Sequence, residues 1–315
     1  MGSRFLDPTA LARLGSLSLK ARTIVEGALS GQHRSPHHGS SVEFAEHKEY
    51  SPGDELKHLD WKAYGKLDRY YVKRFEEETE LTAYLLLDRS GSMTYKGKGL
   101  RKLEIAAYLA GALAHLLIRQ QDRVALHAFG GGRPATIVPP RARHTHLHDL
   151  LATLETVVDG AGEGVTSIGD ALEWVGETAR RRRSLIVVIS DLLDPSVDLA
   201  RHLARLAAAR HDVAVIQVLD RDELAFPFRG VTRFVSLEGP ANVLTDPLAV
   251  RDTYLGELRR FLEKVRKTCR EAGVAWQLVP TDQPLEQGLL DFLAERAGRR
   301  GAGRRDPMAE IGVIP

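Results

Sequence analysis

Three long apolar segments each end in an aspartate, and this pattern constrains the fold more than any other feature of the chain. The segments are LTAYLLLD, SLIVVISD and DVAVIQVLD, which end at Asp88, Asp191 and Asp220. Continuous apolar runs of this length are typical of strands that are covered on both faces. Because helix-like segments separate them, we predict an α/β fold: a mainly parallel central sheet with helices on both faces, as in Rossmann-like proteins.

The helices are predicted from apolar residues that recur every three to four positions. The clearest predicted helix follows the first apolar segment. Between Ile105 and Ile118 nearly all of its faces are apolar, as in a helix packed on a sheet. Other helices are predicted at HTHLHDLLATLETVV, SIGDALEWVGETARRR, PSVDLARHLARLAAARH, VRDTYLGELRRFLEKVRKTCREAG and PLEQGLLDFLAERAGRR. Ser167 is predicted to cap the second of these, and Pro195 to lie near the first turn of the third. Further strands are predicted at DRVALHAFG, PATIVPP and GVAWQLVPTD.

Three parts of the chain are predicted from these patterns. Residues 1–80 form an N-terminal extension, with a helix over Pro8–Gly31, an irregular loop and a small β-rich region rich in aromatic side chains. Residues 81–300 form the α/β domain. Residues 301–315 form a flexible, basic tail.

Composition and charge exclude several classes of protein. Lys and Arg total 44 against 42 Asp and Glu, so a formal charge of +2 gives no reason to expect a nucleic acid as partner. Cys269 is the only cysteine, which excludes a disulfide framework within the chain. We find no signal peptide and no apolar run of about 18 residues, as membrane insertion requires. The expected location is cytoplasmic.

The loop after the first apolar segment has the composition of a cation site. Asp88, Ser90 and Ser92 alternate along it, so their oxygens can point toward one spot, while Gly91 permits a tight backbone. Hydroxyl and carboxylate oxygens suit Mg²⁺, and Mn²⁺ also fits. For any single strand end the alternative is structural, because Asp and Ser commonly start turns or cap helices.

Two later segments add oxygens in matching order, Thr166 in GEGVTSIGDAL and Asp191 in VVISDLLD. Together with Asp88-x-Ser90-x-Ser92 they resemble the metal-ion-dependent adhesion site of von Willebrand factor A domains, over roughly Leu81 to Asp220. The resemblance implies that Ser90 and Ser92 bind the metal directly and that Thr166 binds it directly or through water. Asp88 and Asp191 would hold metal-bound waters. One coordination position would stay open for an acidic side chain of a protein partner.

The segment before this motif, EFAEHKEYSPGDELKHLDWKAYGKLDRYYVKRFEEE, is similar to a bacterial family catalogued as domain of unknown function 58. Lys48 is a departure, since family members often have arginine there. Family members commonly occur with MoxR-type AAA+ ATPases. The resemblance therefore implies an adaptor or partner of such an ATPase, in complex maturation or metal-cofactor insertion. The chain has no Gly-x-x-x-x-Gly-Lys-Ser/Thr loop, so nucleotide-driven work would come from another chain.

An enzyme is the rival class. Phosphatases of the haloacid dehalogenase type also begin with an Asp after a strand, and Asp88 would then be the nucleophile of a metal-dependent hydrolase. Such enzymes have a second carboxylate two residues later, where this chain has Ser90. Ser90 also lacks the Gly-x-Ser-x-Gly elbow of serine hydrolases. We therefore predict a protein-binding module without catalytic residues.

The histidines are expected to be structural rather than metal ligands or catalytic bases. A helix over RHTHLHDL scatters its imidazoles, and His127 on a strand fits a core or edge position. The same holds for the loop histidines: His33, His37 and His38.

Overall fold

A computed structural model describes residues 81–132, 135–160, 164–194 and 197–298, together with the backbone of two short earlier strands. These strands, β1 (His47–Glu49) and β2 (Tyr71–Lys73), pair antiparallel with His47 opposite Lys73. They belong to a separate unit that spans His33–Glu80. The predicted helix at 8–31, the histidines of the 33–38 loop, the side chains of the aromatic region and the tail at 301–315 lie outside the described residues.

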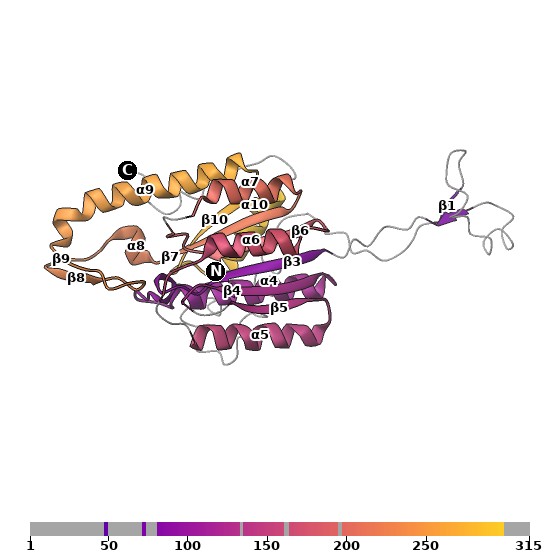
Figure 1. The fold of residues 1–315 in the computed structure, drawn as a ribbon, viewed down its shortest axis with the longest axis horizontal. Coiled ribbons are helices and arrows are strands. Elements are labelled where there is room, and N and C mark those ends of the chain that lie inside the picture. The colour runs from indigo at the N-terminus through magenta and orange to yellow at the C-terminus, as the bar shows by residue number, and fades with distance from the viewer. Residues whose placement is uncertain are drawn as a thin grey trace, which may run out of the picture. The chain divides into compact units, whose positions relative to one another are not determined.

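Six strands form the central sheet, in the order β10-β7-β6-β3-β4-β5 (Figure 1). Every neighbouring pair is parallel except β4 and β5, which are antiparallel. This sheet confirms the predicted α/β fold. The strands are β3 (Thr82–Asp88), β4 (Arg123–Phe129), β5 (Thr136–Arg141), β6 (Ser184–Ser190), β7 (Asp212–Leu219) and β10 (Ala275–Pro280).

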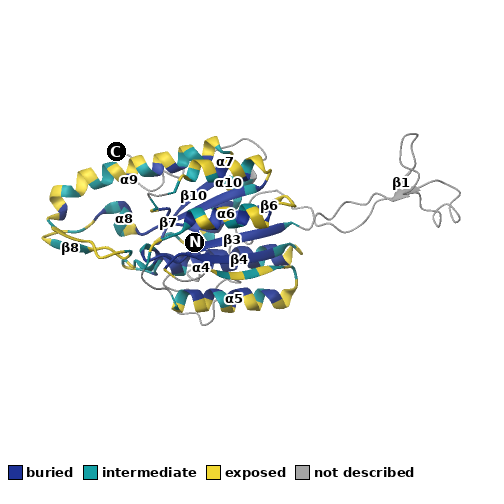
Figure 2. Ribbon diagram, in the orientation of Figure 1, coloured by how far each residue is buried: buried dark blue, intermediate teal, exposed yellow. Residues whose placement is uncertain are grey.

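Burial along the strands explains their sequence patterns. All residues of β3 and β6 are buried, in agreement with their continuous apolar runs. The edge strand β5 instead alternates between exposed and partly buried residues. Figure 2 shows the buried strands at the centre and exposed residues on the outer faces of the helices.

Helices cover both faces of the sheet and complete two apolar cores. One core lies against alternate strand residues such as Leu85 and Leu87, and the other against Tyr84 and Leu86. The first is covered by α4 (Lys102–Arg119), α5 (His144–Asp159) and α10 (Leu285–Gly298). The second is covered by α6 (Ile168–Thr178), α7 (Leu199–Ala208) and α9 (Pro247–Glu271). None of the helices in the described ranges combines the length and apolar character needed to cross a bilayer.

The structure gives the starts of two predicted helices. Ser167 is the N-cap residue of α6, as predicted, but its side chain makes no capping hydrogen bond. The helix α7 begins at Leu199, and Pro195, predicted near its first turn, lies outside the described residues. Asp198 sets this start, because its carboxylate accepts a hydrogen bond from the Arg201 amide and caps the helix there.

Short elements follow two of the strands. After β3, the turn η2 (Ser92–Thr94) buries Met93 completely. After β7 comes α8 (Arg221–Ala225), followed by a hairpin of β8 (Thr232–Val235) and β9 (Asn242–Thr245). These elements lie at the edge of the sheet where the parallel strands end.

Candidate metal centre

The candidate site lies where the winding of the sheet reverses. The strands β3 and β6 are parallel neighbours, and the chain continues from β3 to β4 on one side and from β6 to β7 on the other. The loops that follow the two strands therefore diverge. Open α/β sheets bind ligands in the crevice that forms at such a point. Asp88 ends β3 and Ser190 ends β6, so both face this crevice from the sheet edge.

Asp88 holds three segments together at this crevice. Its side chain is fully buried. The oxygen Oδ1 accepts a hydrogen bond from the Ser90 amide at 2.9 Å. The oxygen Oδ2 accepts one from the Ser190 hydroxyl at 2.6 Å and one from the Thr166 hydroxyl at 3.0 Å. A single carboxylate thus joins the loop after β3, the segment before α6 and the end of β6.

Its surroundings disfavour the ionised form of Asp88. Burial, and then the charge of Asp191, raise the pKa of Asp88 to about 6, although hydrogen bonds from Ser190 and Ser90 act in the opposite direction. A cation beside the carboxylate would favour its ionised form. The electrostatics of the site therefore suit a bound positive charge.

The serine hydroxyls have a spacing that fits a small divalent cation. The Oγ atoms of Ser90 and Ser92 are 3.1 Å apart. Adjacent ligands of an octahedral ion with bonds of 2.0 to 2.1 Å are about 2.9 Å apart. In the described part of the chain, no three His, Cys, Asp or Glu side chains converge as a metal site. A cation at this position would therefore depend on hydroxyl oxygens, as the sequence predicts.

Gly130 allows the loop after β4 to pack directly on Asp88. Its φ is +82°, a conformation that side chains disfavour. A Cβ at this position would lie 3.2 Å from Asp88 Oδ1 and 3.3 Å from the Ser90 nitrogen. The absence of a side chain thus keeps the walls of the site close together.

A buried lysine neutralises Asp191. The side chain of Lys102 is fully buried, and its Nζ donates to Asp191 Oδ2 at 2.8 Å and to Glu223 Oε1 at 2.7 Å. Burial lowers the pKa of Lys102, but Asp191 and Glu223 outweigh this effect and raise it overall, so the amine stays charged. The other Asp191 oxygen accepts a hydrogen bond from the Leu193 amide. A water-mediated role for Asp191 would use the remaining lone pairs of these oxygens.

The structure thus brings Asp88, Ser90, Ser92 and Thr166 to one place, and Asp191 acts on Asp88 through its charge. Sequence reasoning missed Ser190, Lys102 and Glu223. Ser190 directly precedes Asp191, and Asp220-x-x-Glu223 is a capping-box pattern. Lys102 gives no comparable signal, because a lysine in the first turn of a helix is usually solvated.

Asp220, the third strand-end aspartate, has a structural role. Its carboxylate caps α8 by accepting from the Asp222 amide, and it also accepts from the Gly97 amide and the Thr281 hydroxyl. These bonds join three loops without leaving a hydroxyl-lined opening. At the end of β7 the hydrogen bonds therefore support the alternative that the aspartate caps a helix.

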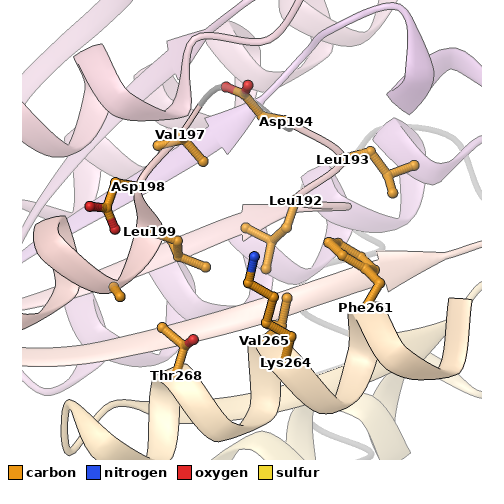
Figure 3. Close-up of a pocket in the computed structure, with 11 residues that line it drawn as sticks. Leu192, Leu193, Asp194, Val197, Asp198, Leu199, Phe261, Lys264, Val265 and Thr268 are labelled. Atoms are coloured by element: carbon orange, nitrogen blue, oxygen red, sulfur yellow. The ribbon is translucent and has the colours of Figure 1, made fainter. Parts of the chain in front are cut away.

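Two cavities adjoin the end of β6. One of about 270 Å³ is lined by residues of the β3 loop and of the β8–β9 hairpin, among them Ser92, Leu193 and Glu238. The other, of about 690 Å³, lies between the loop after β6, α7 and α9 (Figure 3). Its lining is mainly apolar, with Phe261 and Lys264 contributed by α9. It contains none of the predicted metal ligands.

The histidines His127 and His146 are buried, and the predicted core position of His127 is confirmed, although its Nδ1 has no hydrogen-bond partner among the described residues. His146 is buried in α5, and its Nε2 lies 2.9 Å from the Val124 carbonyl oxygen. His127 is buried in β4, where its ring packs against Trp174 at a centroid distance of 4.2 Å. Burial, with a smaller effect from Arg89, lowers the pKa of His127 to about 4, so it is neutral near neutral pH.

The fold and the site define an α/β domain with a cluster of hydroxyls around a buried aspartate at the switch point of its sheet. The family model described as "Protein of unknown function DUF58" matches residues 46–264. The chain therefore belongs to this family. An uncharacterized protein of Mycobacterium tuberculosis is 30% identical over 299 residues, which cover 94% of this chain and 92% of the relative.

Solved structures show more distant likeness. The conserved hypothetical protein BatB from Bacteroides thetaiotaomicron is 18% identical with a TM-score of 0.47, over 69% of this chain and 98% of that one. The VWA domain of SpRpn10 is 14% identical with a TM-score of 0.38, over 68% of this chain and 94% of that one. Both TM-scores are below 0.5. The fold is therefore assigned from the strand order and register of the chain itself.

Proposed function

We propose that the protein binds a divalent cation, Mg²⁺ or Mn²⁺, and uses it to hold an acidic side chain of a protein partner. The main support is the convergence of the Thr166 and Ser190 hydroxyls and the Ser90 amide on Asp88, from three separate segments. Ser90 and Ser92 would bind the cation directly, and Thr166 directly or through water. Asp88 and Asp191 would hold metal-bound waters.

The charges around the site favour capture of an anion. The direct ligands would be neutral hydroxyls, which leave the cation strongly positive. Lys102 already balances part of the negative charge of Asp191 and Glu223. An incoming carboxylate would then be attracted to the cation more than in a site built from carboxylate ligands.

For the partner we propose a MoxR-type AAA+ ATPase, with a role in complex maturation or metal-cofactor insertion. This part of the proposal comes from the family resemblance. It predicts that the two proteins co-purify in the presence of Mg²⁺ and separate when a chelator is added. Co-purification that is equal with and without Mg²⁺ would refute the metal-bridged contact.

The hydrolase alternative has less support. A nucleophilic carboxylate needs an oxygen that a substrate can reach. Asp88 is fully buried, and both of its oxygens accept hydrogen bonds. We therefore propose a non-enzymatic function. Mg²⁺-dependent turnover of p-nitrophenyl phosphate that disappears in Asp88→Asn would contradict this.

Titration with Mn²⁺ tests the metal site. We expect Ser90→Ala and Ser92→Ala to lower Mn²⁺ affinity at least tenfold in calorimetry, as is usual when a metal site loses a supporting group. The matched control is Ser167→Ala, because Ser167 adjoins Thr166 but its hydroxyl makes no capping bond. Wild-type affinity in both site variants would exclude this cation site.

A further inference from the structure

The tip of the β8–β9 hairpin lies against the loop that carries the metal-binding serines. The Ser92 amide donates a hydrogen bond to Glu238 Oε1 at 3.2 Å. The Leu237 carbonyl oxygen packs so closely on Gly91 that a Cβ there would lie 1.9 Å from it. Figure 1 shows the hairpin extending toward this loop from the side of α8 and α9.

The hairpin is anchored at its base and is exposed elsewhere. Phe234 in β8 stacks on Phe226 at a centroid distance of 5.6 Å and meets Phe228 edge-on at 5.3 Å. Val235 and Val243 are each more than half exposed. A two-stranded hairpin is marginally stable by itself, so the position of the tip depends on its contacts with Gly91 and the Ser92 amide.

The Glu238 carboxylate has a free oxygen at the edge of the candidate site. Among the described residues, the Ser92 amide is its only hydrogen-bond partner, and it makes no ion pair. The Ser92 hydroxyl, one of the proposed ligands, belongs to the same residue as this amide. The cavity of about 270 Å³ that Ser92 and Glu238 line leaves space between them. A cation held by Ser90 and Ser92 would therefore meet an unpaired carboxylate of the same chain.

We propose that Glu238 is an internal ligand of the cation in the free protein. Its carboxylate takes the coordination position that would otherwise accept the partner's acidic side chain. This inference rests on the proposed function and adds a regulatory step to it. The partner binds by displacing the hairpin tip, and the tethered carboxylate competes with it at an effective concentration in the millimolar range.

Mn²⁺ alone is the first probe. In calorimetry on the full chain, we expect Glu238→Gln to lower Mn²⁺ affinity about tenfold, because the amide replaces a charged oxygen ligand. Glu263→Gln, at an exposed position of α9, is the matched control and should have no effect. Gly91→Ala is a second variant, which retains Glu238 but displaces the tip through the clash with Leu237. It should lower the affinity to a similar extent.

Hydrogen exchange gives a readout that does not depend on affinity. Mn²⁺ should slow amide exchange in residues 232–245 of the wild type and leave it unchanged in Glu238→Gln. A short peptide with one glutamate should bind the Mn²⁺-loaded Glu238→Gln protein about tenfold more tightly than the wild type, because no internal carboxylate competes.

The outcomes separate the two proposals. Equal Mn²⁺ affinity and equal hairpin protection in wild type and Glu238→Gln, with weak binding by Ser90→Ala, would overturn the role of Glu238 and leave the cation site intact. Absence of Mn²⁺ binding by the wild type would overturn both.

Discussion

The ends of β3 and β7 share a sequence pattern but differ in what they build. Each buried strand leads into a buried aspartate, Asp88 or Asp220. Each carboxylate accepts a hydrogen bond from a threonine hydroxyl of a distant segment, from Thr166 at 3.0 Å and from Thr281 at 2.9 Å. Only Asp88 lies beside a pair of further hydroxyls. Asp220 instead caps a helix.

The position of the strand in the sheet explains this difference. At β3 the winding reverses and the loops diverge, so side chains gather around an opening. At β7 the chain continues in one direction to β10, and the following loop stays packed, with the Thr281 amide bonded to the Leu219 carbonyl. An aspartate after a strand therefore becomes a candidate ligand or a cap according to the topology around it.

The largest predicted effect concerns Lys102. Lys102 joins Asp191 at the end of β6 to Glu223 in α8, after β7. Lys102→Met leaves a buried carboxylate unpaired, so we expect the free energy of unfolding in urea to fall by about 3–5 kcal/mol. Lys264→Met, at an exposed position of α9, is the control and should change it by less than about 0.5 kcal/mol. A loss below about 1 kcal/mol in Lys102→Met would show that the ion pairs are not needed.

The second prediction concerns two buried histidines, His127 in β4 and His211 directly before β7. The pKa of His127 falls to about 4 through burial and the charge of Arg89, so between pH 6.5 and 4 the unfolded chain binds a proton that the native state excludes. The contribution of neutral His127 to the free energy of unfolding is complete above pH 6.5. As the pH falls to 4, this contribution is lost, and it amounts to about 3 kcal/mol. His127→Phe should therefore flatten the acid side of the stability profile.

His211, directly before β7, is the matched comparison. Burial alone lowers its pKa, without the contribution of an arginine. His211→Phe should flatten the profile less than His127→Phe does. Urea unfolding at pH 7 and pH 4.5 measures both, and an equal effect of the two substitutions would count against the role of Arg89.

The smallest predicted effect separates the two threonines. Thr166→Val and Thr281→Val each remove one hydrogen bond to a buried carboxylate, so each should lower the free energy of unfolding by about 1–2 kcal/mol. Only Thr166→Val should weaken Mn²⁺ binding, because only Thr166 lies at the proposed cation site. If Thr281→Val weakened Mn²⁺ binding equally, the distinction between the two strand ends would fail.

Much of the fold was predictable because it depends on local patterns. Continuous apolar runs predicted β3, β6 and β7, and helical periodicity predicted the helices that cover them. The exact start of α7 at Leu199 was not, since it depends on the Asp198 carboxylate satisfying a free amide of the first turn. Among the candidate site residues, Asp88, Ser90, Ser92 and Thr166 were predicted to lie together because their residue types and order are informative in themselves, and the structure brings them together.

The sequence by itself determined that aspartates and hydroxyls follow buried parallel strands, because the strand period and the direction of the chain place strand ends at one edge. Tertiary structure alone decided which of them face one another. It buried Lys102 between two carboxylates and brought Glu238 of a distant hairpin to the Ser92 amide. These contacts join residues far apart in the chain, and no local pattern records them, since they depend on how the loops pack once the sheet has formed.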